Sequence, residues 1–243
     1  MNSNIVVCMP TYNEAENLGN AVAAVARILP QAYTLIIDDN SPDRTGDIAD
    51  ELAGKNAQVF VFHRPVKSGL GKAYLAGFDF ALRQLEADLI VQMDADLSHP
   101  PEALPRLLDA AGKSDLVIGS RYISGGCTEN WGAFRKAISR FGSFYARGIL
   151  GLPVKDPTGG YKVWHADLLK RVLEYPIASG GYVFQVETTY YAAQMRSDIA
   201  EVPIRFVERG CGSSKMTIEI ALEAFWRIPR LRLQANRRCG PQK

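Results

Sequence analysis

The sequence predicts an α/β fold with a mostly parallel, doubly wound sheet in a single domain. Over the first hundred residues, short apolar runs of strand length alternate four times with longer segments of helical periodicity. This alternation is typical of parallel strands connected by helices. The chain has 243 residues, enough for one domain with a substantial core, and no repeat or low-complexity linker divides it.

The expected strands are short apolar runs bounded by turn-forming residues. They lie at residues 5–9, 33–37, 58–62, 89–93, 116–122 and 199–207, and a turn at 156–161 leads into residues 162–164. The expected helices lie at residues 14–29, 45–52, 69–85, 101–111 and 133–152. Asn13 is expected to cap the first helix. Residues 125–130 have the composition of a loop, and the segment from residue 217 is amphipathic and then basic.

Composition excludes several classes of protein. The net charge is only +2 and no block of Lys and Arg is present, so nucleic acid is not an expected partner. Four cysteines and three histidines are widely spaced, which indicates neither a zinc site nor a disulfide framework. The N-terminus does not resemble a signal peptide, and no apolar run has the ~18 residues of a membrane span. We expect a cytoplasmic protein that is at most peripheral on a membrane.

The most informative stretch is the strand at 89–93 and the loop that follows it. This strand delivers Asp94 and Asp96 to the carboxyl end of the sheet, where ligands bind in open α/β folds. Two aspartates separated by one residue can share a hard cation, Mg²⁺ or Mn²⁺, with substrate phosphates. Taken alone, the same pattern is also typical of a solvated turn.

A glycine-rich segment at residues 69–74 fits neither common phosphate-binding motif. It lacks the third glycine of a dinucleotide fingerprint, and Val66 and Ala73 occupy positions that a phosphate-binding P-loop needs for Gly and Ser/Thr. It is either a helix N-terminus able to approach a phosphate or sugar closely, or a plain loop into a helix.

Together, several ordered motifs resemble the inverting family-2 glycosyltransferases of GT-A fold, and among them the dolichol- or polyprenol-phosphate mannose synthases. The motifs that carry the resemblance lie at residues 10–14, 38–43, 94–96, 119–122, 131–139, 156–161, 181–185, 201–209 and 214–215. They cover roughly residues 5–216 in order. The resemblance implies a GT-A catalytic domain at residues 1–216 and a tail at 217–243.

The resemblance implies transfer of mannose from GDP-mannose to a polyprenyl or dolichyl phosphate, with inversion at the anomeric carbon. Its donor-binding residues would be Pro10, Tyr12, Glu14, Ile37, Asp39, Asp94, Ala95, Asp96, Arg121, Arg209 and Lys215. A divalent metal held by Asp96, and by Asp94 directly or through water, would neutralise the GDP leaving group. Some relatives carry glutamine at the position of Ser98, so the part of Ser98 in metal binding stays open. Arg209 and Lys215 lie on a Gly/Ser-rich segment that is either a lid or a basic connector.

A phosphate acceptor needs positioning by cations, because a phosphate monoester is already anionic and requires no general base. Arg121, and Arg135 with Ser139 one helical turn further on, are the candidates for the acceptor phosphate. Asp96, Arg121 and Arg135 are therefore the candidate catalytic residues. Taken singly, each arginine would more commonly form a surface salt bridge, and the motif context favours phosphate binding.

The lipid acceptor implies contact with a membrane. Ile218, Leu222, Phe225 and Trp226 have helical spacing before a basic tail, which suits an interfacial helix, although Pro229 is expected to interrupt it. Packing on the domain itself, or anchoring by an integral membrane partner, are the alternatives. The rival functions are transfer of another sugar such as glucose from UDP-glucose, a sugar-nucleotidyltransferase, and a non-catalytic nucleotide-binding protein.

Overall fold

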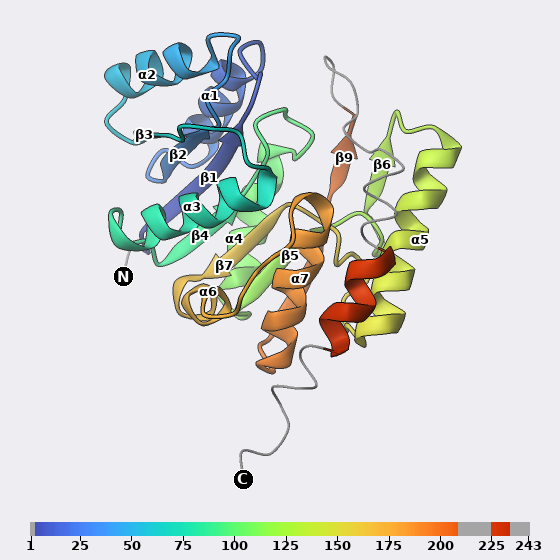
Figure 1. The fold of residues 1–243 in the computed structure, drawn as a ribbon. Coiled ribbons are helices and arrows are strands. Elements are labelled where there is room, and N and C mark those ends of the chain that lie inside the picture. The colour runs from blue at the N-terminus through green and yellow to red at the C-terminus, as the bar shows by residue number, and fades with distance from the viewer. Residues whose placement is uncertain (1–2, 209–224, 234–243) are drawn as a thin grey trace.

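A seven-stranded sheet forms the centre of the computed structural model, which describes residues 3–208 and 225–233 (Figure 1). Its strand order is β3-β2-β1-β4-β7-β5-β8. These strands are β1 Ile5–Thr11, β2 Tyr33–Asp38, β3 Val59–His63, β4 Leu89–Gln92, β5 Leu116–Ser120, β7 Lys162–His165 and β8 Ile199–Pro203. Only β7 runs antiparallel to its neighbours, β4 and β5. The predicted α/β class with a mostly parallel sheet is confirmed.

Helices cover both faces of this sheet, as a doubly wound fold requires. They are α1 Leu18–Ile28, α2 Thr45–Lys55, α3 Leu70–Arg83, the 3₁₀ turn η1 Pro101–Ala103, α4 Leu104–Ala111, α5 Ala133–Leu150, α6 Ala166–Leu173 and α7 Gly181–Gln194. Side chains alternate along β1, so Val6 and Cys8 join the core beneath α3, α6 and α7, whereas Val7 and Met9 join the core beneath α1 and α4.

The first helix begins four residues later than expected. Asn13 has a left-handed backbone (φ 58°) and caps no helix, and α1 starts at Leu18. The backbone N–H groups of Glu14 and Ala15 donate instead to Thr45 Oγ1 (2.9 Å) and Asp43 Oδ2 (3.2 Å). These contacts tie the chain after β1 to the start of α2, and this long-range tie overrides the local capping signal.

The expected strand at 199–207 is two strands in two sheets. β8 extends the main sheet beside β5, whereas β9 (Arg205–Val207) pairs with β6 (Cys127–Glu129) in a small parallel ribbon. The prediction of a plain loop at 125–130 was therefore wrong for β6. Three-residue strands show no alternating apolar pattern that a sequence could reveal.

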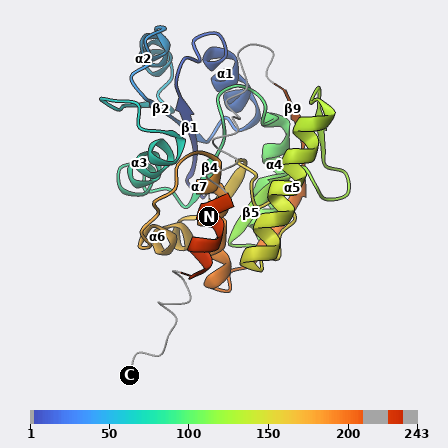
Figure 2. The same ribbon diagram turned by 45° about the vertical axis from the view of Figure 1, so that its right-hand side comes forward.

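Residues 225–233 form a helix that packs beside α5 (Figure 2). Pro229 lies inside this helix, contrary to the expected interruption. A proline has no N–H for the carbonyl four residues before it, which here is that of Phe225. The Tyr145 hydroxyl donates to that carbonyl instead (2.9 Å), so α5 compensates for the missing bond. Among the described residues, none of the helices combines the length and the apolar character needed to span a bilayer.

Candidate active site

A cavity of about 490 Å³ opens where β1, β2, β4 and β5 end. Its wall has three parts, which we name for their chemistry. The carboxylate end includes Tyr12, Glu14, Asp39, Asp94 and Asp96; the arginine end is Arg121, Arg135 and Ser139; the apolar end is Ile138, Phe141, Tyr145, Val183, Val186, Phe225 and Ile228. One cavity thus brings together side chains from Tyr12 to Ile228, which lie far apart in the chain.

Asp94 and Asp96 lie on the loop after β4, and neighbouring groups fix both. The Tyr74 hydroxyl donates to Asp94 Oδ1 (2.9 Å), and the Ser98 N–H donates to Asp96 Oδ1 (2.9 Å). Burial, and then the charge of Asp94, raise the pKa of Tyr74 well above its ordinary value, so the phenol stays protonated and donates. Leu97 adopts a left-handed backbone (φ 60°), which turns the loop between the two carboxylates and the buried Ser98 and His99.

His99 has a structural role that the sequence reasoning missed. Its buried imidazole accepts a hydrogen bond at Nδ1 from the Asp94 N–H (3.0 Å) and stacks on Tyr161 at 4.9 Å. Because Nδ1 accepts, the neutral ring carries its proton on Nε2. The histidine thereby fixes the backbone at Asp94. The available signal was its position five residues after Asp94 in a single loop.

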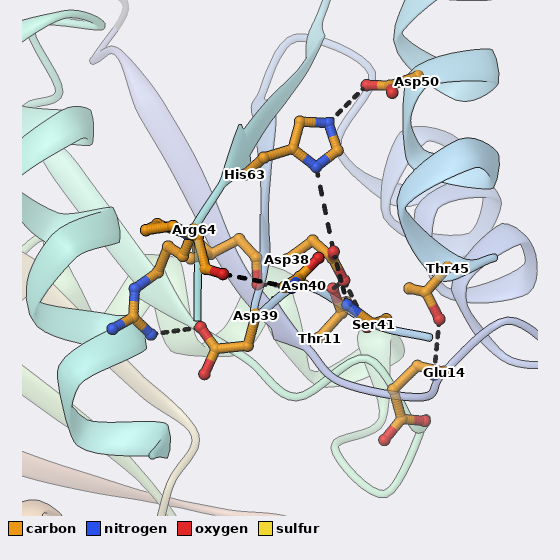
Figure 3. Close-up of polar contacts among 12 residues, drawn as sticks. Thr11, Glu14, Asp38, Asp39, Asn40, Ser41, Thr45, Asp50, His63 and Arg64 are labelled. Carbon is orange, nitrogen blue, oxygen red and sulfur yellow. Dashed lines mark hydrogen bonds and ion pairs between the residues drawn. The ribbon is translucent and has the colours of Figure 1, made fainter. Parts of the chain in front are cut away.

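Of the two adjacent aspartates at the end of β2, only Asp39 lines the cavity. Asp38 is buried and accepts hydrogen bonds from Thr11 Oγ1 (3.1 Å) and the Ser41 N–H (3.1 Å), as Figure 3 shows. Asp39 forms an ion pair with Arg64. Neither aspartate caps α2, since Asp43 accepts the Thr45 N–H (3.1 Å) there.

The predicted donor-binding residues differ in where they lie. Pro10, Tyr12, Glu14, Asp39, Asp94, Ala95, Asp96 and Arg121 all line the cavity. Ile37 does not, because its side chain is fully buried and packs against Gly77 of α3. Arg209 and Lys215 lie outside the described residues. Lys67, which was not predicted, lines the cavity with its ammonium 3.6 Å from the centroid of the Tyr12 ring.

The glycine-rich segment contributes to the cavity in part. Gly69 has φ 98° and precedes α3, and both Gly69 and Leu70 line the cavity. Gly71 has a packing role, since a Cβ there would lie 2.8 Å from the Ser179 carbonyl. This helix start therefore reaches the cavity, while its second glycine lets α3 approach the segment before α7.

Arg121 follows β5 and is held by a buried carboxylate. Its Nε and Nη2 donate to the two oxygens of Asp156, each at 2.7 Å, and Nη2 also donates to Thr158 Oγ1 (2.8 Å). The rings of Tyr122, Trp131 and Phe206 lie 5.1–5.7 Å from its guanidinium carbon. Burial opposes the ionisation of Asp156, but Arg121 outweighs it and holds the pKa of Asp156 below its ordinary value.

Arg135 lies in the first turn of α5, stacked on Trp131 at 4.1 Å, and forms an ion pair with Glu208. Ser139 lies one turn further and accepts a hydrogen bond from the Tyr122 hydroxyl (2.6 Å). The three predicted acceptor residues thus meet at one end of one cavity. Their partners Asp156 and Glu208 were not predicted as such.

A buried lysine lies beneath the cavity on β7. Lys162 Nζ donates to the Gln185 carbonyl (2.8 Å) and to Thr189 Oγ1 (2.9 Å) of α7. Burial lowers the pKa of Lys162 to about 7. Gln185 lines the cavity and its side chain accepts from Gln92 Nε2 of β4 (2.7 Å), so this network joins α7 to two strands under the site.

Comparison with known proteins indicates the family. The model of glycosyl transferase family 2 matches residues 6–173. The chain is 46% identical over 232 residues to an undecaprenyl-phosphate mannosyltransferase of Micrococcus luteus, covering 96% of this chain and 95% of that one. It is 44% identical over 225 residues to a polyprenol monophosphomannose synthase of Mycolicibacterium smegmatis, covering 92% and 84%. It is 36% identical over 234 residues to a dolichol-phosphate mannosyltransferase of Pyrococcus furiosus, covering 93% of this chain and 63% of that relative.

Solved structures support the fold. A glucosyl-3-phosphoglycerate synthase from Mycobacterium tuberculosis, in complex with Mn²⁺, UDP and glucosyl-3-phosphoglycerate, has a TM-score of 0.64 at 19% identity, covering 100% of this chain and 82% of that one. A further mycobacterial protein has a TM-score of 0.68 at 20% identity, covering 100% and 76%. At these identities the likeness concerns the GT-A-type fold alone.

Proposed function

Because the chain belongs to glycosyltransferase family 2, we propose that it transfers mannose from GDP-mannose to a polyprenyl phosphate with inversion at the anomeric carbon. The names of the relatives in M. luteus and M. smegmatis support mannose as the sugar and a polyprenyl phosphate as the acceptor. The guanine nucleotide follows from the resemblance of the motifs at residues 10–14 and 38–43.

The observation that carries this proposal is the chemistry that one cavity combines. Its lining includes carboxylates suited to a metal-bound diphosphate, arginines suited to a phosphate, and a set of apolar side chains. A soluble sugar acceptor would not need the apolar end. An isoprenoid phosphate would bind the arginine end through its phosphate and the apolar end through its isoprenoid chain.

The carboxylate end fits a hard divalent cation. Asp94 and Asp96 offer carboxylate oxygens beside the buried Ser98 hydroxyl, and an all-oxygen donor set suits Mg²⁺ or Mn²⁺. Within residues 3–208 and 225–233, no third His, Cys, Asp or Glu completes a protein-only metal cluster, so substrate oxygens and water would fill the remaining positions. When bound, the metal would neutralise the charge that develops on the GDP leaving group. Asp39 and Glu14 would hold the nucleoside.

The arginine end would position the nucleophile. A phosphate oxygen of the acceptor attacks the anomeric carbon, and the bond from that carbon to the β-phosphate oxygen of GDP breaks with its electron pair leaving on GDP. No proton has to be removed from the acceptor. Asp156 keeps the Arg121 guanidinium in one orientation, and Ser139 adds a hydroxyl beside Arg135. The side chains thereby supply orientation and charge, which are the main needs of such a displacement.

The test is a transfer assay with purified protein, a panel of labelled nucleotide sugars, and farnesyl phosphate as a short acceptor. We expect a mannosylated lipid phosphate from GDP-mannose, and none when free farnesol replaces the phosphate. Preferred transfer of glucose from UDP-glucose would replace the proposal with the rival donor. Product from free farnesol would contradict the phosphate acceptor.

We further propose that the protein works as a peripheral protein on the cytoplasmic face of a membrane, through α5 and the helix at 225–233. Large apolar side chains are exposed on these two neighbouring helices, namely Phe134, Phe141, Phe144, Phe225, Trp226 and Leu233. An exposed apolar patch beside the apolar end of the cavity is suited to a lipid surface. The boundary that the sequence predicts at 216/217 lies outside the described residues.

Vesicle co-sedimentation tests this membrane contact. Phe134→Ser with Phe144→Ser should weaken binding to anionic vesicles several-fold, because both rings are more than two-thirds exposed and neither lines the cavity. Val66→Ser, at an exposed apolar residue after β3, is the matched control and should bind as the parent protein does. Equal binding by all three proteins would remove this surface from the proposal.

A further inference from the structure

Arg135, the proposed ligand of the acceptor phosphate, already has an anionic partner. Its Nη1 is ion-paired with Glu208 Oε1, and both side chains line the cavity. Glu208 directly follows β9, and its N–H donates to the Glu129 carbonyl of β6 (3.3 Å). The two side chains are 23% and 35% exposed, so water screens the pair only in part. A carboxylate thus occupies the position at which the phosphate would bind.

The wall around this ion pair has hydrogen-bond donors that the carboxylate does not satisfy. Arg135 Nε and Trp131 Nε1 are buried and have no hydrogen-bond partner among the described residues. They are two of the three such side-chain atoms in that part of the chain, and they belong to side chains stacked at 4.1 Å. Buried N–H groups without an acceptor are unfavourable. A phosphate monoester, with three non-bridging oxygens, can accept more hydrogen bonds here than a carboxylate can.

Two anions cannot share this guanidinium without repulsion. A phosphate within hydrogen-bond reach of Arg135 would lie next to the Glu208 carboxylate, and like charges at contact distances oppose each other in a partly buried site. The binding of a phosphate therefore weakens the ion pair between Arg135 and Glu208 and favours the departure of the carboxylate.

We propose that Glu208 occupies the acceptor-phosphate site of the empty enzyme and that the acceptor phosphate displaces it from Arg135. This inference rests on the proposed function, because it concerns the same acceptor. Glu208 then acts as a specificity-determining residue. It lowers the affinity of Arg135 for every anion, so that small anions are held weakly and only an acceptor that also fills the apolar end binds well.

The test measures binding of farnesyl phosphate by calorimetry, without donor, to the full chain and its variants. Glu208→Gln keeps the shape of the side chain and removes its charge, and it should tighten binding by at least about fivefold at low salt. Binding should also become more salt-sensitive, because the cation is no longer compensated. Inorganic phosphate should become a measurable competitor of farnesyl phosphate in this variant.

Two controls identify the cause of any gain. Glu129→Gln removes another carboxylate of the same β6–β9 ribbon, whose ion pair with Arg205 (2.6 Å) lies outside the cavity lining, and should leave the Kd unchanged. In an Arg135→Ala background, Glu208→Gln should not tighten the binding of farnesyl phosphate. The guanidinium for which the carboxylate and the phosphate compete is absent from that background. Thermal melts of each variant verify that it is folded.

The outcomes separate the two proposals. Unchanged or weaker binding by folded Glu208→Gln overturns the exchange and makes Glu208 a residue that positions Arg135. A gain that persists without Arg135 also overturns it. If the parent protein forms no mannosylated lipid but Glu208→Gln still binds phosphate more tightly through Arg135, the proposed transfer function is wrong. The proposed displacement of Glu208 from Arg135 is then still supported. Should product form normally without that gain, only the exchange fails.

Discussion

The carboxylate end and the arginine end of the cavity are held in different ways. At the carboxylate end, Asp94 and Asp96 have partners within their own loop, His99 and Ser98, and Tyr74 of α3 adds a contact to Asp94 from 20 positions away. At the arginine end, Arg121 is held by a residue 35 positions later and Arg135 by one 73 positions later. The loop that carries Asp94 and Asp96 is thus shaped largely by its own turns, whereas Arg121 and Arg135 depend on carboxylates that are distant in sequence. Mutations at the carboxylate end should therefore mainly reduce the rate of transfer. Mutations at the arginine end should mainly reduce the stability of the protein or its use of the acceptor.

The largest effect is expected for Asp96→Ala. Loss of a proposed metal ligand should reduce transfer by at least ~10³-fold, because several kcal/mol of leaving-group stabilisation are lost. Metal-dependent GDP binding should weaken, while the melting temperature changes little. Single-turnover rates and GDP calorimetry with and without Mn²⁺ measure this, with the exposed Asp109→Ala as control. Near-normal turnover by Asp96→Ala in the presence of EDTA would remove the metal from the mechanism.

At the arginine end, Asp156→Ala should instead unfold the protein more easily. It leaves Arg121 buried without its counter-charge, which costs about 3–5 kcal/mol in the free energy of unfolding. Urea denaturation measures this cost, and Glu129→Gln, in a surface pair, should change little. Asp156→Ala with the stability of the parent protein would mean that the arginine end does not depend on long-range support.

Arg135→Ala should affect acceptor use by ~1.5–3 kcal/mol, the contribution of a charge-assisted hydrogen bond. The affinity for GDP-mannose should stay nearly constant. Initial rates with varied farnesyl phosphate at fixed GDP-mannose provide the measurement, and Arg140→Ala, on the same helix but not in the cavity lining, is the control. A raised KM for GDP-mannose with an unchanged lipid KM would assign Arg135 to the donor.

The buried Lys162 of β7 gives an effect of a different kind, a slope in stability with pH. Burial lowers its pKa to about 7 in the folded chain, against ~10.4 in the unfolded chain. Between those values the unfolded chain binds more protons, so the free energy of unfolding rises with pH by up to ~1.4 kcal/mol per unit. Lys162→Met should lose that rise in urea denaturation between pH 7 and 9.5. Exposed Lys170→Met should keep it, and parallel profiles for both variants would contradict the shift.

The sequence predicted the main sheet well, because buried strands carry their own signal. The runs that became β1, β2, β4 and β5 are mostly apolar, which is typical of strands buried in a parallel sheet. It did not predict β6, since a three-residue strand has no periodicity. The helix through Pro229 could not be predicted either, because its compensation comes from Tyr145, 80 residues away.

For the site, the residue types in the motifs were predictable but their partners were not. Arg121, Arg135 and Ser139 could be proposed from motif and spacing, and all three line the cavity. That Asp156 and Glu208 pair with the two arginines follows only from tertiary contacts. Ile37 shows the opposite error, since a motif position near the cavity need not face it.

The antiparallel strand β7 has a consequence for the width of the site. It lies between β4, which leads to Asp94 and Asp96, and β5, which leads to Arg121. Adjacent strands are ≈ 4.8 Å apart, so one intervening strand separates the ends of β4 and β5 by roughly 10 Å. Hydrogen bonding across the sheet fixes this interval, whatever the loops above it contain. Loop substitutions can therefore change which sugar or lipid is selected, while the span between leaving group and nucleophile stays constant.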